Sequence, residues 1–455
     1  MVVFFIIIII FLLSSILFRK AAGTLDIGKI NIVSYIYFLF LLQTFIGISL
    51  IKLGYDEHYT LNYLLDREGA INTTFVVVMF VAVTFPMVIW GSQKIFGVNM
   101  SQAYSVYLGA KPEKCGGNIY YKVLSIISVI LIVLLAGYLI KIGYVPVMKL
   151  VFASTSFDFA HERIRIGSVY FLHPYITNLL ILQGIPLLSY LSFAFALIEK
   201  EKRWYILAGV LFIASVITKT YKFSKAPLPF HLFVYVLICI YLYGGIKRRI
   251  MVLVGATMVI MLLGMYALTG ASSSLFDIYN GIWGRTLFSQ VGTLSYVFDL
   301  FPKHMPFLSG RSLSGNILRL LGENPEEHLR SAKLVMDFYG SEKVYDGIAG
   351  VMNTIFVGEA YANWGWAGIV GAVIWVGIVI AVLSIIIVKM KKNAISITFC
   401  AVITTKIGNA SQGGFCDFIY NIDLYLTIFI FLGLYFTPYI CGKLKRIKVE
   451  SKNDD

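Results

Sequence analysis

Residues 358–392 read GEAYANWGWAGIVGAVIWVGIVIAVLSIIIVKMKK: a polar start, a long apolar run and a basic end. A helix needs an apolar run of about 20 residues to cross roughly 30 Å of hydrocarbon, and this run is long enough. Similar runs recur along the chain. The pattern predicts about eleven spanning helices, near residues 2–18, 30–51, 73–93, 123–140, 172–198, 204–218, 227–246, 250–269, 360–388, 394–412 and 421–441.

Composition supports the same fold class. Of 455 residues, 58% are hydrophobic and 14% are charged, which is too apolar for a soluble globular protein. We therefore predict an all-α polytopic membrane protein. The first apolar run ends at Arg19 and Lys20 without a small-residue cleavage site, so we interpret it as a retained helix rather than a signal peptide. The five cysteines are scattered, and we predict no disulfide framework, no metal site and no cofactor.

Orientation follows from the basic loops. Short clusters such as KPEK at 111, KEKR at 200, KRR at 247 and KLKRIK at 443 are expected to lie in the cytoplasm. The net charge of +14 is then a signal of topology rather than of nucleic-acid binding. On this interpretation the external segments are 52–72, 141–168, 219–226, 270–358 and 413–420.

The predicted organisation has four parts. They are an N-terminal bundle of about eight helices (1–269), a large external loop (270–358), about three C-terminal helices (359–441), and a cytoplasmic tail that is first basic and then acidic (442–455). The large loop has no spanning run, and stretches such as PEEHLRSAKLVMDFYG predict short helices in it. Loops of this length are usually functional.

Basic residues on the predicted external side suggest an anionic ligand. Arginine matches phosphate oxygens with two hydrogen bonds and lysine supplies a point charge, so diphosphate is the natural candidate. The alternative is that the lysines reach lipid headgroups and the arginines are solvated. Whether the stretch HERIR forms a strand or an irregular loop stays open. The candidate diphosphate ligands are Arg163, Arg165, Lys222, Lys225, Arg285 and Arg311.

The polar start of the quoted stretch supplies a second group of candidates. Glu359 stands in the first turn of its helix, where the helix dipole favours a carboxylate, and Asn363 follows one turn later on the same face. A carboxylate and an amide placed in this way suit sugar hydroxyls, and Tyr361 lies between them in sequence. The alternative is that Glu359 only caps the helix beside an interfacial belt of Trp364 and Trp366.

Several of these motifs resemble one family. GEAYANWGWAGIVG (358–371), SKAPL (224–228) and GYVPVMKL (143–150) with HERIR (161–165) are similar to motifs of the Wzy-type polymerases of O-antigen and capsule, the oligosaccharide repeat unit polymerases. The resemblance implies a GT-C-like glycosyltransferase architecture in the bacterial inner membrane, with the active site facing the periplasm. The implied partners are membrane lipid, a donor and an acceptor both linked to undecaprenyl diphosphate, and a chain-length regulator protein, without nucleic acid.

The resemblance also implies an activity, in which the growing glycan leaves undecaprenyl diphosphate and joins a lipid-linked repeat unit. Glu359 would act as the catalytic base or would orient the sugar, Asn363 and Tyr361 would bind sugar, and the basic set would bind the diphosphate. Two alternatives stay open. An O-antigen ligase uses the same donor, and a flippase or transporter would place charges deep in the bundle, where Lys406 and Asp423 are the candidates.

Overall fold

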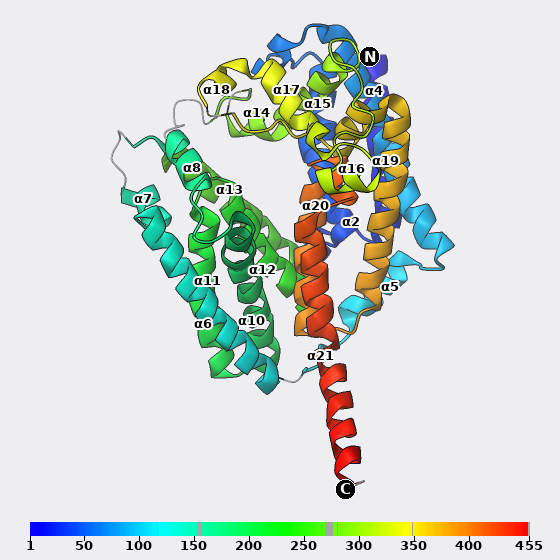
Figure 1. Ribbon diagram of the computed structural model, residues 1–455. Helices are drawn as coiled ribbons and strands as arrows, with labels where there is room; N and C mark the ends of the chain where they lie inside the picture. Colours follow the sequence, from blue (N-terminus) through cyan, green and yellow to red (C-terminus); the bar gives the residue numbers. More distant parts are fainter. Residues whose placement is uncertain (116, 153–156, 269–275, 280, 348, 454–455) are drawn as a thin grey trace. The chain divides into compact units, whose positions relative to one another are not determined.

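The computed structural model describes residues 1–115, 117–152, 157–268, 276–279, 281–347 and 349–453 (Figure 1). Within these ranges the chain contains helices and no strand, apart from one isolated bridge between Glu113 and Asn393. The prediction of an all-α protein is confirmed. Residues 153–156 of the predicted external segment 141–168, and residues 270–275, 280 and 348 of the predicted large loop, lie outside the described residues.

The chain is a multi-pass membrane protein. Among the described residues, nine helical segments are long and apolar enough to cross a membrane: Val2–Lys29, Ile32–Lys52, Arg67–Ile95, Gly117–Ile142, Pro174–Glu199, Lys202–Thr220, Arg248–Leu268, Phe356–Lys389 and Phe415–Thr437. Helices also form at the other two expected spans. These are α12 (Pro227–Tyr243), which has 17 residues, and α20 (Ala394–Ser411), and neither is among the nine. Of the roughly eleven expected spans, nine are therefore confirmed as long and apolar enough within the described residues.

In space the chain groups into two compact units. Unit 1 consists of Met1–Val106, Gly270–Lys389 and Thr404–Asn421, and unit 2 of Tyr107–Thr269, Met390–Ile403 and Ile422–Asp455. The units therefore combine segments that are distant in sequence. The four-part division along the sequence stays a prediction, although its last part continues as helix, because α21 extends to Asn453.

Unit 1 is organised around α4 (Arg67–Ile95), which packs against α1, α15 and α19. The helix begins after Asp66, whose carboxylate accepts a hydrogen bond from the Gly69 backbone N–H at 3.0 Å.

Within the predicted large loop, short helices form as expected. The other helices of unit 1 are α1 (Val2–Ala22), η1 (Ile27–Lys29), α2 (Ile32–Phe40), η2 (Leu41–Phe45), α3 (Ile46–Lys52), η3 (Tyr59–Tyr63), α14 (Ile282–Leu287), α15 (Ser289–Leu300), α16 (Gly315–Leu320), η5 (Pro325–Glu327), α17 (Ser331–Tyr339), α18 (Ser341–Tyr345), α19 (Phe356–Lys389) and η6 (Phe415–Phe418), with α5 (Met100–Gly109) and α20 divided between the units.

The quoted stretch forms α19, and the helix is broken inside it. Trp364 and Gly365 have non-helical backbone angles, and Gly365 has φ 59° and ψ −142°. A residue with a side chain rarely adopts such angles, so the glycine permits the break. The first turns of α19, which carry Glu359, are thereby separated from the long apolar part of the helix. The continuous helix expected over 360–388 is wrong at this point.

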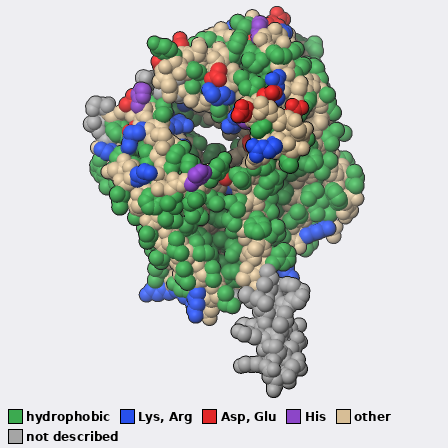
Figure 2. Space-filling model, in the orientation of Figure 1, with side chains coloured by type: hydrophobic (Ala, Val, Ile, Leu, Met, Phe, Trp, Pro, Cys, Tyr) green, Lys and Arg blue, Asp and Glu red, His purple; other side chains and the backbone are tan. Residues whose placement is uncertain are grey.

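Unit 2 contains α6 (Gly117–Ile142), α7 (Pro146–Phe152), α8 (Phe159–Gly167), α9 (Pro174–Ile176), η4 (Thr177–Gly184), α10 (Ile185–Glu199), α11 (Lys202–Thr220), α12, α13 (Arg248–Leu268) and α21 (Ile422–Asn453). A buried polar cluster joins α10, α11 and α12, since His231 binds the Tyr190 hydroxyl at 2.5 Å and the Ser215 hydroxyl at 2.8 Å. Both ring nitrogens therefore have partners. Hydrophobic side chains cover most of the face that Figure 2 shows, as lipid contact requires.

Candidate functional site

A polar cavity of about 190 Å³ lies in unit 1. Three parts of the chain build it: residues 297, 312–332 and 352–354 of the predicted large loop, the start of α19, and the turn at 413–420 between α20 and α21. The sequence places all three on one predicted side of the membrane. The polar and charged side chains that line the cavity are Ser312, Ser314, His328, Arg330, Ser331, Asn353, Thr354, Glu359, Asp417 and Tyr420.

Glu359 lines this cavity and is buried. It is 7% exposed, and its Oε2 accepts a hydrogen bond from the Cys416 backbone N–H at 2.9 Å. The carboxylate approaches the turn closely because residue 414 is glycine: a Cβ on Gly414 would lie 3.1 Å from Cδ of Glu359. Glu359 thus binds the beginning of η6, and its predicted place in the first turn of a helix is confirmed.

Asp417 is the second carboxylate of the cavity. It is half-buried, and its Oδ2 accepts a long hydrogen bond of 3.4 Å from the Gly414 backbone N–H. Arg330 interacts electrostatically with both Glu359 and Asp417. Arg330 is exposed, and its guanidinium donates a hydrogen bond to Oδ1 of Asn353 at 3.2 Å. Two carboxylates and one arginine therefore share a small polar space, which suits a ligand rich in hydroxyl groups.

The wall of the cavity is anchored by a buried carboxylate, Asp299 of α15. Its oxygens accept hydrogen bonds from the backbone N–H groups of Leu65 at 2.7 Å and Asp66 at 2.9 Å, and from the Tyr339 hydroxyl at 2.8 Å. These bonds connect the start of α4 with α15 and α17, which lie side by side in Figure 1. A buried carboxylate needs several hydrogen-bond donors, and Asp299 has three here. Its bond to Tyr339 holds α17, the helix that begins directly after Arg330, against α15.

The two predicted sugar-binding residues lie beside the cavity rather than on its lining. Asn363 is buried, its Oδ1 accepts hydrogen bonds from the backbone N–H groups of Gly310 (3.0 Å) and Ser312 (3.3 Å), and its Nδ2 donates to the Glu359 carbonyl at 2.8 Å. The amide therefore holds the loop before α16 against α19. Tyr361 is also buried, and its ring packs edge-on against Phe298 at 4.7 Å.

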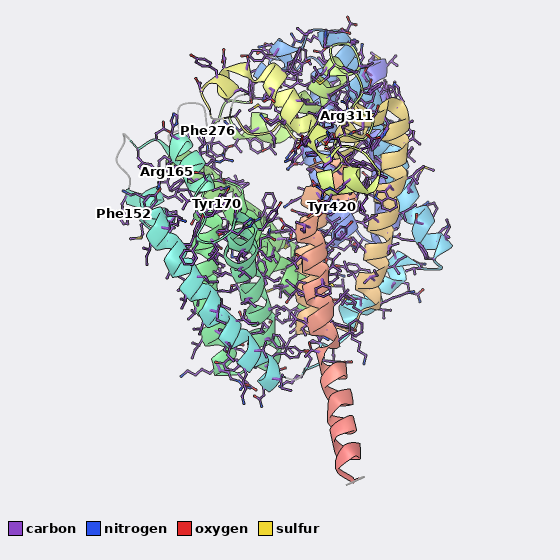
Figure 3. The ribbon with its side chains drawn as sticks, viewed as in Figure 1. Phe152, Arg165, Tyr170, Phe276, Arg311 and Tyr420 are labelled. Atoms are coloured by element: carbon purple, nitrogen blue, oxygen red, sulfur yellow. The ribbon has the colours of Figure 1, made fainter. Side chains whose placement is uncertain are left out.

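Two predicted diphosphate ligands belong to unit 1 but not to the cavity lining. Arg311 lies in the loop before α16 (Figure 3), and its Nε donates a hydrogen bond to the Leu308 carbonyl at 3.1 Å. Arg285 is exposed on α14, and its charge acts on His58. His58 is fully buried, and burial followed by the charge of Arg285 lowers its pKa to about 4. The imidazole is therefore neutral near pH 7.

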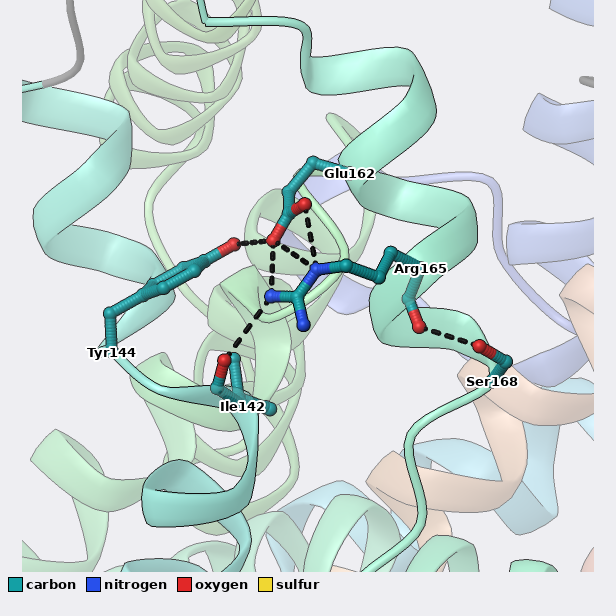
Figure 4. A network of polar contacts seen from close by, with 5 residues as sticks. All are labelled: Ile142, Tyr144, Glu162, Arg165 and Ser168. Atoms are coloured by element: carbon teal, nitrogen blue, oxygen red, sulfur yellow. Dashed lines mark hydrogen bonds and ion pairs between the residues drawn. The ribbon is translucent and has the colours of Figure 1, made fainter.

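Arg163 and Arg165 belong to unit 2. The stretch HERIR forms α8, so both the strand and the irregular loop are wrong for it. Residues two apart on a helix point in different directions, and the two arginines have different surroundings. Arg165 forms a network with Glu162 (Figure 4): its Nε lies 2.8 and 2.9 Å from the carboxylate oxygens, and the Tyr144 hydroxyl binds the same carboxylate. Hydrogen bonds from Arg165 lower the pKa of Glu162.

Arg163 instead lies near a second cation. Burial, followed by the charge of Arg163, lowers the pKa of Lys222, and Lys222 Nζ would lie 3.6 Å from a Cβ placed on Gly167 of α8. In the part of the chain that the structure describes, neither Arg163 nor Lys222 has an acidic partner. Lys225 lies over the ring of Tyr266, 3.7 Å from its centroid. Of the predicted diphosphate ligands, the structure thus brings Arg163 and Lys222 together.

The sequence places Arg330 among the basic residues of the predicted external side, but not among the candidate diphosphate ligands, and it did not single out Asp417, His328 or Asn353. The signal for Asp417 was available in the stretch QGGFCDF, where two glycines and a carboxylate fill a short connection on the predicted external side. Arg330 and His328 are two of many polar residues in a long loop, and no spacing separates them from the rest. Comparison of the chain with protein-family models, with curated proteins and with solved structures gives no match.

Proposed function

We propose that this protein polymerises lipid-linked oligosaccharide repeat units of O-antigen or capsular polysaccharide at the external leaflet of a bacterial inner membrane. One observation carries the proposal: Glu359, the large-loop residue Arg330 and Asp417 of the 413–420 turn line one polar cavity. The basic-loop pattern assigns these segments to the external side, where a lipid-linked glycan would be met after it crosses the membrane.

The proposed reaction is a single displacement. A hydroxyl oxygen of the acceptor repeat unit attacks the anomeric carbon of the growing glycan, the bond from that carbon to the diphosphate oxygen breaks, and the hydroxyl proton passes to a carboxylate of the cavity. Glu359 and Asp417 are the two carboxylates that line the cavity. One carboxylate is enough for a displacement with inversion, and the electron pair leaves on the diphosphate.

Cations stabilise the charge that develops on a departing diphosphate. The predicted basic set stays a prediction for this role, and Arg163 and Lys222 are members of it that lie near each other. Two neighbouring like charges repel each other, and their proximity is favoured when an anion binds between them. Arg165, Lys225, Arg285 and Arg311 remain predicted diphosphate ligands. A GT-C-like architecture belongs to the same proposal.

Product analysis of surface polysaccharide tests the proposal. A strain deleted for this gene is complemented with the wild-type gene or with an empty vector, and the glycans are compared as a gel ladder. A polymerase predicts that the deletion strain carries a single repeat unit and that the wild-type gene restores the ladder. If the deletion instead leaves long lipid-linked polymer that is not transferred, the protein is a ligase. Accumulation of repeat units on the inner leaflet would identify a transporter.

A reconstituted assay isolates the chemistry. Purified protein in lipid vesicles is supplied with undecaprenyl-diphosphate-linked repeat units, and longer glycans and free undecaprenyl diphosphate are measured together. The proposal expects one undecaprenyl diphosphate released for each repeat unit added. Glycan of unchanged length in active, monodisperse preparations would contradict it.

A further inference from the structure

The cavity contains two carboxylates, and they differ in how far the protein itself engages them. Glu359 is 7% exposed and binds the Cys416 backbone N–H at 2.9 Å through Oε2. Its approach depends on the missing side chain of Gly414. A carboxylate that holds a backbone N–H at the beginning of a turn has a structural task, because moving it would leave that N–H unpaired in a buried place.

The turn that Glu359 holds is the turn that carries the second carboxylate. Cys416 precedes Asp417 in η6, so the bond from Glu359 to the Cys416 N–H fixes the backbone next to Asp417. Gly413 lies on the other side, where a Cβ would stand 2.9 Å from Oδ2 of Asp417. The missing side chain of Gly413 thus leaves room for the Asp417 carboxylate, and Glu359 holds the backbone next to it.

Asp417 is the more available of the two. It is half-buried, and within the described residues the hydrogen bond that it accepts, from the Gly414 N–H, is long at 3.4 Å. Neighbouring groups of the cavity are also available. The Ser314 hydroxyl has no hydrogen-bond partner among the described residues, and Arg330 lines the cavity and donates one hydrogen bond to Asn353. A hydroxyl-bearing ligand would find an acceptor in Asp417 and donors in Arg330 and Ser314.

We propose that Asp417 is the catalytic base for the acceptor hydroxyl and that Glu359 is a positioning residue for it; this assignment rests on the proposed function. As the hydroxyl oxygen forms its bond to the anomeric carbon, its proton moves to a carboxylate oxygen of Asp417. The diphosphate leaves with the electron pair of the broken bond, and Asp417 later returns the proton to water. Arg330 lies beside both carboxylates and orients the acceptor.

Three substitutions test the assignment in the reconstituted assay, with the wild-type protein as the reference for activity. Asp417→Asn keeps the size and the hydrogen bond to Gly414 but removes the base, so kcat should fall by about 10²-fold or more with KM nearly unchanged. Glu359→Gln keeps an oxygen for the Cys416 N–H, and kcat should stay within roughly fivefold of the wild type. Glu359→Ala removes that acceptor and should lose activity. Activity in Glu359→Gln but not in Glu359→Ala would show that position 359 needs a hydrogen-bond acceptor rather than a base.

Asp337→Asn is the matched control, since Asp337 forms an exposed ion pair with Lys333 on α17 and does not line the cavity. It should behave as wild type. Size-exclusion profiles and thermal transitions in detergent show whether each variant is folded. If folded Glu359→Gln is as inactive as Asp417→Asn, or if Asp417→Asn keeps wild-type kcat, the assignment is overturned while polymerisation by the wild type stands. A wild-type protein that elongates no glycan would refute the proposed function instead.

Discussion

In the cavity of unit 1 and on the surface around α8 in unit 2, the protein holds two residues of like charge to different degrees. In the cavity, Glu359 binds a backbone N–H while Asp417 accepts one long hydrogen bond. Around α8, Arg165 is held by Glu162 and Tyr144 while Arg163 lies near Lys222. Each region thus contains one residue that the fold holds by closer hydrogen bonds and one that it holds less closely. Charge is alike within each pair, so the surroundings separate the two members.

This difference has a practical meaning for choosing site residues. A side chain whose polar atoms all have partners in the protein stabilises the fold, and replacing it affects stability first. A charged side chain that lies next to like charges, or that has one weak hydrogen-bond partner, lowers the stability of the fold unless a ligand or water supplies the missing interactions. The following predictions are ordered by expected effect. Each tests whether a residue mainly stabilises the fold or is available to a ligand.

The largest effect is expected for Asn363→Ala. The substitution removes two hydrogen bonds to the Gly310 and Ser312 N–H groups and one to the Glu359 carbonyl, all in a buried place, and should lower the free energy of unfolding by roughly 3 to 5 kcal/mol. Thermal unfolding in detergent measures it. Asn316→Ala is the control, because Asn316 is exposed and binds Tyr420 weakly at 3.4 Å. Equal stability of the two variants would place Asn363 among the available residues.

A pH effect of up to about 3 kcal/mol is expected from His58, whose pKa is about 4 in the fold and about 6.5 when unfolded. Between these values the unfolded chain binds a proton that the folded chain does not, so stability falls as pH decreases from 6.5 to 4. The cause is that Nε2 is buried without a partner in the described residues, near Arg285. His58→Gln should flatten stability across this window. An unchanged slope in that variant would rule out His58 as the source.

Gly365→Ala should cost roughly 1 to 3 kcal/mol, because φ of 59° strains any residue with a side chain. A Cβ there would also lie 3.1 Å from Cζ of Phe307. Gly371→Ala lies six residues further along the same helix, with nothing within 4 Å of its Cβ position, and should be neutral or slightly stabilising. The contrast in thermal stability tests the break in α19, and a cost at Gly371 as large as that at Gly365 would speak against it.

The smallest change in stability is expected for Arg163→Ala, within about 0.5 kcal/mol of wild type, because the exposed arginine has no acidic partner in the described residues. Arg165→Ala should cost up to about 1 kcal/mol by removing the ion pair with Glu162. For binding, the order reverses. Inorganic diphosphate should bind Arg163→Ala more weakly than Arg165→Ala by calorimetry, with Arg203→Ala as control. Equal weakening by both would remove the distinction between them.

Much of the fold follows from the sequence because the bilayer imposes one strong rule. Apolar runs predict the spans, and helices occur at all eleven expected positions. The break at Gly365 was not predicted, because a single glycine between two tryptophans does not disturb the hydropathy of the run. The helix α8 was also missed, since its charged residues have no apolar periodicity strong enough to indicate a helix.

The site was predictable in part. Glu359 lines a polar cavity, and its position in the first turn of a helix on the predicted external side was the feature that indicated it as a candidate. Arg330 and Asp417 join it from segments about 30 and 60 residues away, and such meetings depend on tertiary packing that periodicity does not encode. The sugar-binding role of Asn363 stays a prediction. Its hydrogen bonds to the backbone show a framework role that a list of residue types cannot reveal.

The glycine at position 414 has a consequence for sequence variation. Any side chain there would stand where the Glu359 carboxylate now lies, so a larger residue is compatible with this turn only when position 359 also becomes smaller or uncharged. The two positions are 55 residues apart in the chain yet should be inherited as a pair. In a library randomised at both, the combination of glycine and glutamate should be recovered far more often than the product of their separate frequencies, and Gly414→Ala should be tolerated best beside Glu359→Ser or Glu359→Ala.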